Sequence, residues 1–521
     1  MDLLSALLVE LVVIAILFEV ARRVGVPYPS LFVLGGLGLG FVPGLPHITL
    51  NPDLVLLVFL PPLLFAAAFE TPLRDLRRNL APVVRLSLGL VVFTTLAVGA
   101  VAHAMVPTLG WPAALTLGAI VAPTDALAAT SVFRRVGVPR LIITIIEGEA
   151  LFNDATALIA YRTAVIATVS GSFVLASALT GFAITAIGGI AVGYLVGRAS
   201  VEILRHVDDP PVEVIISLLI PFAAYLPADR AGMSGVLAVV TAGFIIGRRL
   251  GTVLSPSSRT MWFVTWKMVG FVLNGFAFVL IGLKLPDILA GVANRPPLQV
   301  FGVAALVCGV ALGARLLWVY ASGLLPGSPR RRIARRDPRL AWRLTFLAGW
   351  TGLRGAVSLA AALALPVTFP EHDLILLLTF AVILVTLVGQ GLTLPMVARW
   401  TAWDGVEVEG ASGEAEFARA TMYQVGLDAI RGARPKWPGH QPLLDRLESS
   451  LRDRTEHLAT EDPGETAERR QERLEHEEIQ AGVINAQRAA MIELREAGEI
   501  NDSTLRTIER ELDLEELRME A

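Results

Sequence analysis

Residues 141–168 form an apolar segment long enough to cross a lipid bilayer, yet its middle carries ionisable side chains. The stretch 147–162 reads Glu-Gly-Glu-Ala-Leu-Phe-Asn-Asp-Ala-Thr-Ala-Leu-Ile-Ala-Tyr-Arg. A charged side chain near the centre of a bilayer costs at least about 2.5 kcal/mol, so such residues face a protein interior or a water-filled cavity. On a helix Glu149 and Asn153 stack one turn apart, and Asp154 lies about 100° further round. The pattern predicts one accessible carboxylate, Asp154, beside a supporting pair.

The composition is that of a protein that crosses a membrane many times. Of 521 residues, 54% are hydrophobic and 17% are charged, and the mean hydropathy is +0.62. We expect an all-α polytopic membrane protein with about thirteen transmembrane helices, because apolar segments cover residues 3–21, 29–45, 52–70, 81–105, 111–133, 141–168, 173–203, 211–228, 232–247, 261–283, 298–325, 342–367 and 374–398. The single cysteine, Cys308, excludes a disulfide framework and suggests no metal cluster.

Charge divides the chain into two expected domains. Residues 1–402 carry 29 Lys and Arg against 19 Asp and Glu, whereas residues 403–521 carry 15 against 28. We therefore expect a transmembrane domain over 1–402 and an acidic, helical cytoplasmic domain over 403–521.

Within the acidic domain, the Gly- and Glu-rich residues 402–416 are expected to be a linker, and a helical pattern follows from about residue 417, for example at Leu443, Leu447 and Leu451. Pro463-Gly464 divides the helical part, and Asn501-Asp502-Ser503 is a candidate cap of a last helix. Residues 403–521 contain no nucleotide-binding glycine loop and no basic patch. We expect no enzymatic activity, no cofactor and no nucleic-acid partner.

The connections between the apolar segments alternate in charge. One set of ends carries 22 Lys and Arg, including Arg74, Arg77 and Arg78, whereas the opposite set carries three. Because positive residues favour the cytoplasmic side, this pattern predicts an external N-terminus and a cytoplasmic C-terminus in the cell membrane.

Two of the apolar segments contain helix-breaking sequences. The fifth contains Ala122-Pro123-Thr124-Asp125, where proline removes a helix hydrogen bond, and the twelfth contains the glycine-rich run Gly349-Trp350-Thr351-Gly352-Leu353-Arg354-Gly355. Broken helices at matching places in two halves indicate a transporter with two inverted repeats, here segments 1–6 and 8–13. We expect the two breaks to cross.

The polar residues of these segments suit the exchange of a monovalent cation for a proton. A carboxylate binds a cation when it is ionised and a proton otherwise, and hard cations prefer carboxylate and carbonyl oxygens. Asp154 is the candidate, with Asp125 and the backbone carbonyl of Thr124, freed by the helix break, opposite it. Arg354 is permanently charged and should pair with an acid, for which Glu149 and Glu147 are the two alternatives. Arg315 also lies within a segment, and support and function are both open for it.

Several of these motifs resemble those of a known family. Ala122-Pro123-Thr124-Asp125, the stretch 147–158 and Leu-Arg-Gly-Ala-Val-Ser-Leu-Ala at 353–360 look like signatures of the cation:proton antiporter-1 family, which includes bacterial NhaP-type antiporters and animal sodium/proton exchangers. The resemblance covers roughly residues 5–400, and residues 494–502 resemble the tails of some bacterial members.

The resemblance implies a homodimer in membrane lipid, in which each protomer has a dimerisation domain and a mobile ion-carrying core. Asp154 matches the aspartate that binds ion and proton, and Asn153 matches the partner found in electroneutral exchangers. Thr124 and Asp125 match ligands at the unwound helix, and Glu149 and Arg354 match a structural ion pair. Ala150 departs from the family pattern, because many members have a serine there whose hydroxyl helps to ligate the ion.

The sequence thus predicts a sodium (or lithium)/proton antiporter that works by alternating access. Exchange of potassium for protons is the nearest alternative, since cation selectivity depends on cavity size and ligand placement. A channel or a transport-inactive membrane sensor is the alternative from another class.

Overall fold

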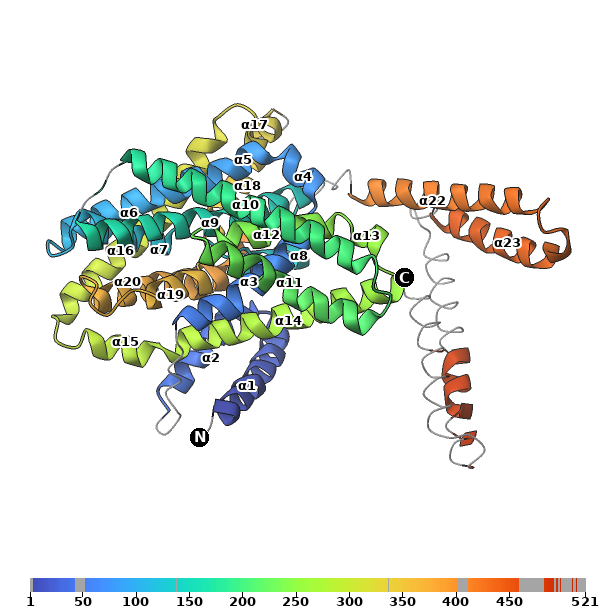
Figure 1. Ribbon diagram of the computed structural model, residues 1–521, viewed down its shortest axis with the longest axis horizontal. Coiled ribbons are helices and arrows are strands. Elements are labelled where there is room, and N and C mark those ends of the chain that lie inside the picture. Colours follow the sequence, from blue (N-terminus) through green and yellow to red (C-terminus); the bar gives the residue numbers. More distant parts are fainter. Residues whose placement is uncertain are drawn as a thin grey trace. The chain divides into compact units, whose positions relative to one another are not determined.

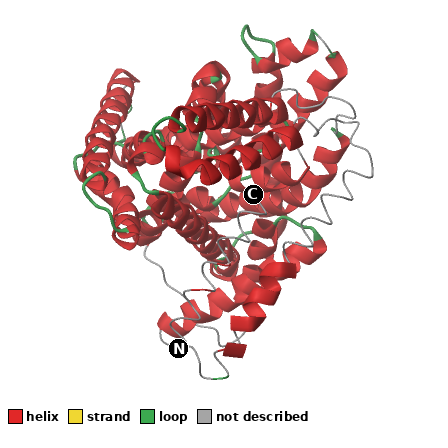
Figure 2. Cartoon of the chain, turned by 90° about the vertical axis from the view of Figure 1, so that its right-hand side faces the viewer, coloured by secondary structure: helices red, strands yellow, loops and turns green. Residues whose placement is uncertain are grey.

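The computed structural model describes residues 3–42, residues 52–401 apart from 137, 172, 174 and 336, residues 411–458, and parts of 482–512. Over these residues the regular structure is helical, and Figure 2 shows helices joined by loops. The chain divides into two compact units, Met1–Asp404 and Gly405–Ala521. The all-helical class expected from the sequence is confirmed.

The first half of the larger unit is a succession of helices and one π-helical turn, labelled in Figure 1 where there is room. They are α1 Leu3–Val24, α2 Tyr28–Gly40, α3 Pro52–Glu70, α4 Leu73–Arg78, α5 Leu80–Val84, η1 Arg85–Leu90, α6 Val91–Met105, α7 Trp111–Val121, α8 Ala126–Val136, α9 Arg140–Ser170 and α10 Leu175–Leu204.

The second half continues in the same manner. Its elements are α11 Pro210–Arg230, α12 Gly235–Gly247, α13 Leu250–Val253, α14 Pro256–Leu283, α15 Leu285–Gly291, α16 Pro297–Gly323, α17 Pro329–Ala334, α18 Pro338–Trp350, α19 Ala356–Leu363, α20 His372–Leu384, η2 Val385–Gln390 and α21 Gly391–Trp400.

Among the described residues, six helical segments are long and apolar enough to cross a membrane, and four shorter ones are also apolar. The long helix α9 is not one of the six, although its 31 residues exceed a membrane thickness. Its carboxylates lower its hydropathy, as expected for the helix that carries the polar stretch. The count of thirteen spans and the inverted repeats stay predictions.

Both expected helix breaks are present. The first lies between α7, which ends at Val121, and α8, which begins at Ala126. The second lies between α18, which ends at Trp350, and α19, which begins at Ala356. The two breaks touch, because the backbone N–H of Asp125 donates to the carbonyl of Leu353 at 2.7 Å. The predicted crossing of two broken helices is therefore confirmed.

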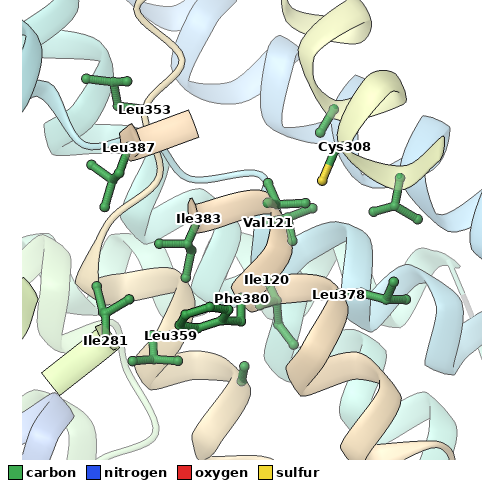
Figure 3. Close-up of a cluster of buried hydrophobic side chains, with 14 of the residues drawn as sticks. Ile120, Val121, Ile281, Cys308, Leu353, Leu359, Leu378, Phe380, Ile383 and Leu387 are labelled. Atoms are coloured by element: carbon green, nitrogen blue, oxygen red, sulfur yellow. The ribbon is translucent and has the colours of Figure 1, made fainter. Parts of the chain in front are cut away.

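A cluster of buried apolar side chains surrounds this crossing. Figure 3 shows Val121 at the end of α7, Leu353 within the second break, and Phe380 and Ile383 of α20 gathered in one region. Each of these side chains is at most 1% exposed. A low-dielectric surrounding strengthens every polar contact at the crossing and makes each unpaired polar group costly.

The smaller unit contains α22 (Ala411–Ala433) and α23 (Gln441–Leu458), shown in orange in Figure 1. The two helices contact each other, and Arg434 donates to Asp445 at 2.7 Å and to Glu448 at 2.6 Å. The hydrogen bond from Arg434 lowers the pKa of Glu448 below its ordinary value. The acidic tail is thus helical over these residues, as expected from its sequence pattern.

Two details of this unit differ from the sequence analysis. The helix α22 begins at Ala411, within the part of 402–416 expected to be a linker, and residues 402–410 lie outside the described residues. Leu444 of α23 is buried, whereas Leu443 and Leu447 are exposed. The proposed division at Pro463-Gly464 and the cap at 501–503 also lie outside the described residues.

Helices α2 and α14 approach each other through glycine. A Cβ added at Gly36 would collide with the backbone carbonyl of Val279, and one at Gly282 would collide with that of Val33. Small residues allow such close backbone contact between membrane helices, where dispersion replaces the hydrophobic effect as the source of stability. A Cβ added at Gly38, on the same helix as Gly36, meets nothing within 4 Å.

We predict that Gly36→Ala lowers the free energy of unfolding by about 1–3 kcal/mol, because the added methyl must push α2 away from α14. Gly38→Ala is the matched control and should be neutral or stabilising by up to about 1 kcal/mol, since alanine favours the helix. Reversible denaturation in mixed micelles measures both. Equal effects of the two substitutions would contradict the close backbone contact.

Candidate functional site

Thr124, in the first helix break, joins the polar residues of α9. Its hydroxyl donates to Glu149 Oε1 at 3.0 Å and accepts from Asn153 Nδ2 at 2.8 Å. Because the hydroxyl has a single proton and gives it to Glu149, Asn153 must present its NH₂ group to Thr124. The structure therefore brings Thr124, Glu149 and Asn153 together. The sequence predicted Thr124 opposite Asp154, and that placement stays a prediction.

Glu149 forms its buried ion pair with Arg315 of α16. Both guanidinium ends contact the carboxylate, Nη1 to Oε1 and Nη2 to Oε2 at 3.0 Å, and both side chains are 1% exposed. From the sequence, Glu149 was one of two alternative partners of Arg354, and the family resemblance implied that pair. The structure pairs Glu149 with Arg315 instead. The physical reason is that Glu149 and Arg315 lie far apart in the sequence, and only the packing of α16 brings Arg315 to α9.

Arg354 instead binds backbone carbonyls at the crossing. Its Nε donates to the carbonyl of Val121 at 3.0 Å, and its Nη1 donates to the carbonyl of Gly352. Val121 is the last residue of α7, so its carbonyl lost its helical partner at the break. Arg354 thus supplies hydrogen bonds and positive charge at a helix C-terminus, where the helix dipole favours a cation.

Arg315 does the same for the other broken helix. Beyond its pair with Glu149, Nη2 donates to the carbonyl of Ala348, near the end of α18, at 3.2 Å. It also approaches the hydroxyl of Thr351 at 3.4 Å. In each broken helix, a carbonyl at the C-terminal end of the first half therefore accepts a hydrogen bond from an arginine. Arg315, for which the sequence left support and function open, has a contact that supports the site.

Asp125 lies at the start of α8, and its carboxylate also lies against Gly355 at the start of α19. Its Oδ1 accepts from the backbone N–H of Leu127 at 2.8 Å and so caps α8. Gly355 precedes α19, and a Cβ added there would collide with the Asp125 carboxylate. A glycine at 355 is required because the carboxylate occupies that space. The Asp125 carboxylate thus lies beside the N-termini of α8 and α19.

Asp154 differs from its neighbours in having no donor. It is 8% exposed, and among the described residues no group donates a hydrogen bond to its carboxylate. The Asp125 charge acts on it by electrostatic repulsion. Asn153 Oδ1 is likewise buried without a partner there. Asn153 Oδ1 is thus a buried acceptor without a donor among the described residues, which is costly unless a ligand binds it.

The ionisable side chains of the site, counted in their charged forms, have a net charge of one negative unit. Glu149, Asp125 and Asp154 are acidic, and the guanidiniums of Arg315 and Arg354 are basic. Since Glu149 is matched by Arg315, the remaining carboxylates and Arg354 together attract one positive charge.

Three further residues, Glu147, Thr351 and Thr386, lie near the site or contact its arginines. Glu147 is half-buried two residues before Glu149, and its role stays a prediction. Sequence reasoning missed Thr386 of η2, whose hydroxyl accepts from the backbone N–H of Arg354 at 3.1 Å. A threonine in an apolar span is too common to be singled out. Thr351, also missed, could have been found from its place within the glycine-rich break.

Crossed broken helices with buried carboxylates at the crossing define a polytopic transporter of the secondary-active class. Residues 9–400 match the family described as "Sodium/hydrogen exchanger, transmembrane". The chain belongs to this family, which is one of transporters rather than enzymes.

Known relatives agree with this assignment. An uncharacterised Na⁺/H⁺ exchanger of Mycobacterium tuberculosis is 33% identical over 98% of this chain and 95% of its own. The "Sodium, potassium, lithium and rubidium/H⁺ antiporter" of Bacillus pumilus is 35% identical over 76% of this chain and 62% of its own. Among solved structures, the sodium proton antiporter MjNhaP1 of Methanocaldococcus jannaschii has the same fold, with a TM-score of 0.60 at 22% identity over 77% of this chain and 99% of that one.

We predict that Arg315→Met lowers the free energy of unfolding by about 3–5 kcal/mol, because it leaves the Glu149 carboxylate buried and unpaired. The double variant Glu149→Gln with Arg315→Met should lose much less than the sum of the two single variants. The matched cycle of Glu149→Gln with Arg354→Met should show a smaller coupling. A larger coupling to Arg354 in reversible denaturation would restore the ion pair first expected from the sequence.

Proposed function

We propose that the protein is a secondary active antiporter that exchanges Na⁺ or Li⁺ for H⁺ across the cell membrane, with cation and proton competing for Asp154. The observation that carries this proposal is the Asp154 carboxylate, which is buried in the crossing and receives no hydrogen bond from the described residues. A buried carboxylate in that situation needs a bound cation or a bound proton. Family membership supports the same activity.

The cation ligands follow from the oxygens around Asp154. We assign the carboxylates of Asp154 and Asp125 and oxygen of Thr124 to the cation, and Asn153 to their support. Asn153 Oδ1, buried and unpartnered, is an additional oxygen within the same turn of α9. Oxygen ligands of this kind suit hard cations. Glu149, Arg315 and Arg354 hold the broken helices and leave Asp154 for the transported ions.

The charge of the site supports electroneutral exchange. One Na⁺ or one H⁺ neutralises the same remaining negative charge, so each half of the cycle carries equal charge across the membrane. Two occupied states without a net charge also cross a low-dielectric barrier at lower cost than an empty, charged state. Because the empty, charged site crosses the membrane at a higher cost, neither ion is carried across without the return of the other.

The protein is a multi-pass membrane protein by its family and its apolar helices. We further propose an external N-terminus and a cytoplasmic C-terminus, which the charge of the connections supports. We also propose a homodimer that works by alternating access, which the family resemblance supports. In each protomer, a mobile ion-carrying core would move against a dimerisation domain.

The potassium alternative has one specific observation in its favour. Ala150 lies one helical turn before Asp154 and brings no hydroxyl to the cation. The relative from Bacillus pumilus is named for sodium, potassium, lithium and rubidium together. If the protein exchanges potassium for protons, we therefore expect it to accept several monovalent cations rather than potassium alone.

We predict that Asp154→Asn abolishes cation-induced proton flux in proteoliposomes, to the level of protein-free liposomes. An amide cannot take up a proton or carry the charge that a cation needs. Sodium, lithium and potassium are tested separately by the quenching of an internal pH dye. Asp208→Asn, an exposed aspartate outside the site, is the matched control and should retain full flux. Equal flux of Asp154→Asn and wild type would refute the proposed role of Asp154.

We predict that Ala150→Ser lowers the apparent KM for sodium relative to potassium by about two- to tenfold, the usual worth of one added hydrogen-bonding or ligating oxygen. The smaller ion gains more from an additional close ligand. Ala160→Ser, which makes the same change on α9 away from Asp154, should leave the ratio unchanged. An unchanged ratio in Ala150→Ser would mean that position 150 does not face the cation.

A further inference from the structure

A hollow of about 720 Å³ lies between the end of α3, the short helix α4 and the end of α12. Its lining includes four arginines, Arg74, Arg77 and Arg78 around α4 and Arg248 after α12. All four side chains are exposed. We call these four residues the arginine pocket. It is separate from the crossing, and the proposed exchange of ions makes no use of it.

Among the described residues that line the hollow, the four arginines outnumber the acidic side chains. Among the described residues, none of the four arginines forms an ion pair with a carboxylate. Glu70 also lines the hollow but already takes part in another interaction, and Asp75 is exposed on α4. Four like charges around one hollow repel one another, so an anion bound between them is favoured.

The chemistry of the lining selects the kind of anion. Arginine binds phosphate with paired, charge-assisted hydrogen bonds. Phe69 and Phe244 give the same hollow an apolar wall. A ligand with a phosphate next to an apolar portion fits both features, and basic pockets between membrane helices bind anionic lipid headgroups. We propose that the arginine pocket binds the phosphate group of an anionic phospholipid.

The arginine pocket is linked to the ion site by two contacts. Phe244 lies 6.2 Å from Phe152, measured between ring centroids, and Phe152 is two residues before Asp154. Leu76, between the arginines of α4, is buried against α9, where a Cβ added at Gly148 would lie 2.7 Å from Leu76 Cδ1. A phosphate bound here neutralises charge that otherwise repels a cation approaching Asp154 from this side.

The binding test uses full-length protein in detergent with dioleoyl phosphatidic acid, and native mass spectrometry counts the lipid retained. Arg74→Gln, Arg77→Gln and Arg248→Gln together remove three charges from the pocket. The matched control removes three exposed arginines from outside it, with Arg198→Gln, Arg249→Gln and Arg399→Gln. We expect the pocket variant to bind about fivefold more weakly for each arginine removed, and the control to bind as wild type does.

Two results would overturn the proposal. One is equal retention of phosphatidic acid by wild type and both variants, and the other is equal loss in the two variants, which would indicate general surface attraction. The single variant Arg77→Gln keeps the test valid if the triple variant does not fold, since about fivefold weaker binding is expected there as well. Competition by inorganic phosphate at equal concentration would assign the site to a free anion, and its failure to compete assigns the site to lipid.

A flux measurement tests the link to transport, which rests on the proposed function. In phosphatidylcholine liposomes, added phosphatidic acid should lower the apparent KM of wild type for sodium. The pocket variant should have a KM below that of wild type in phosphatidylcholine alone, whether or not phosphatidic acid is present. If the variant binds no lipid yet its KM still responds, the link is wrong. If wild type shows no antiport but retains lipid in a pocket-dependent manner, the proposed function fails and the phosphate site stands.

Discussion

The structure depends on the satisfaction of backbone groups where two helices are broken within an apolar surrounding. An unpaired backbone carbonyl or N–H there costs several kcal/mol. Arg354 binds the carbonyl of Val121, Arg315 binds that of Ala348, and the N–H of Asp125 binds the carbonyl of Leu353. These contacts convert two costly breaks into a fixed crossing. They also bring permanent positive charge to the helix ends, and that charge makes buried carboxylates affordable nearby.

The division of charge at the crossing leaves one acidic residue available for the proposed ion exchange. Glu149 is bound to Arg315, and Asp125 caps α8. Asp154, on the next position of α9 after Asn153, is left without a donor from the described residues. The same arginines that stabilise the fold therefore define which carboxylate remains reactive. The residues that stabilise the crossing and the residue proposed for ion exchange are therefore neighbours, although they are not the same.

The sequence predicted a large part of the site because helical spacing and breaks are local properties. Helical spacing places Glu149 and Asn153 one turn apart, and Pro123 predicts the break beside Thr124. The contact of the Thr124 hydroxyl with both side chains is seen only in the structure. The partner of Glu149 likewise could not be found from the sequence. Arg315 and Arg354 are both arginines within apolar segments, and spacing along the chain does not tell which one reaches α9. The structure decides it, because α16 packs where its guanidinium meets the carboxylate.

The sequence by itself determined the helical membrane class, the two breaks and the identity of the candidate ion-binding residues. It did so because hydropathy, proline and buried charge act through local energies that any fold must meet. Only the tertiary structure decided the pairing of the arginines, the capping role of Asp125 and the hollow between α3, α4 and α12. Each of these depends on side chains distant in the sequence, whose meeting is fixed by packing between helices and by no pattern within one of them.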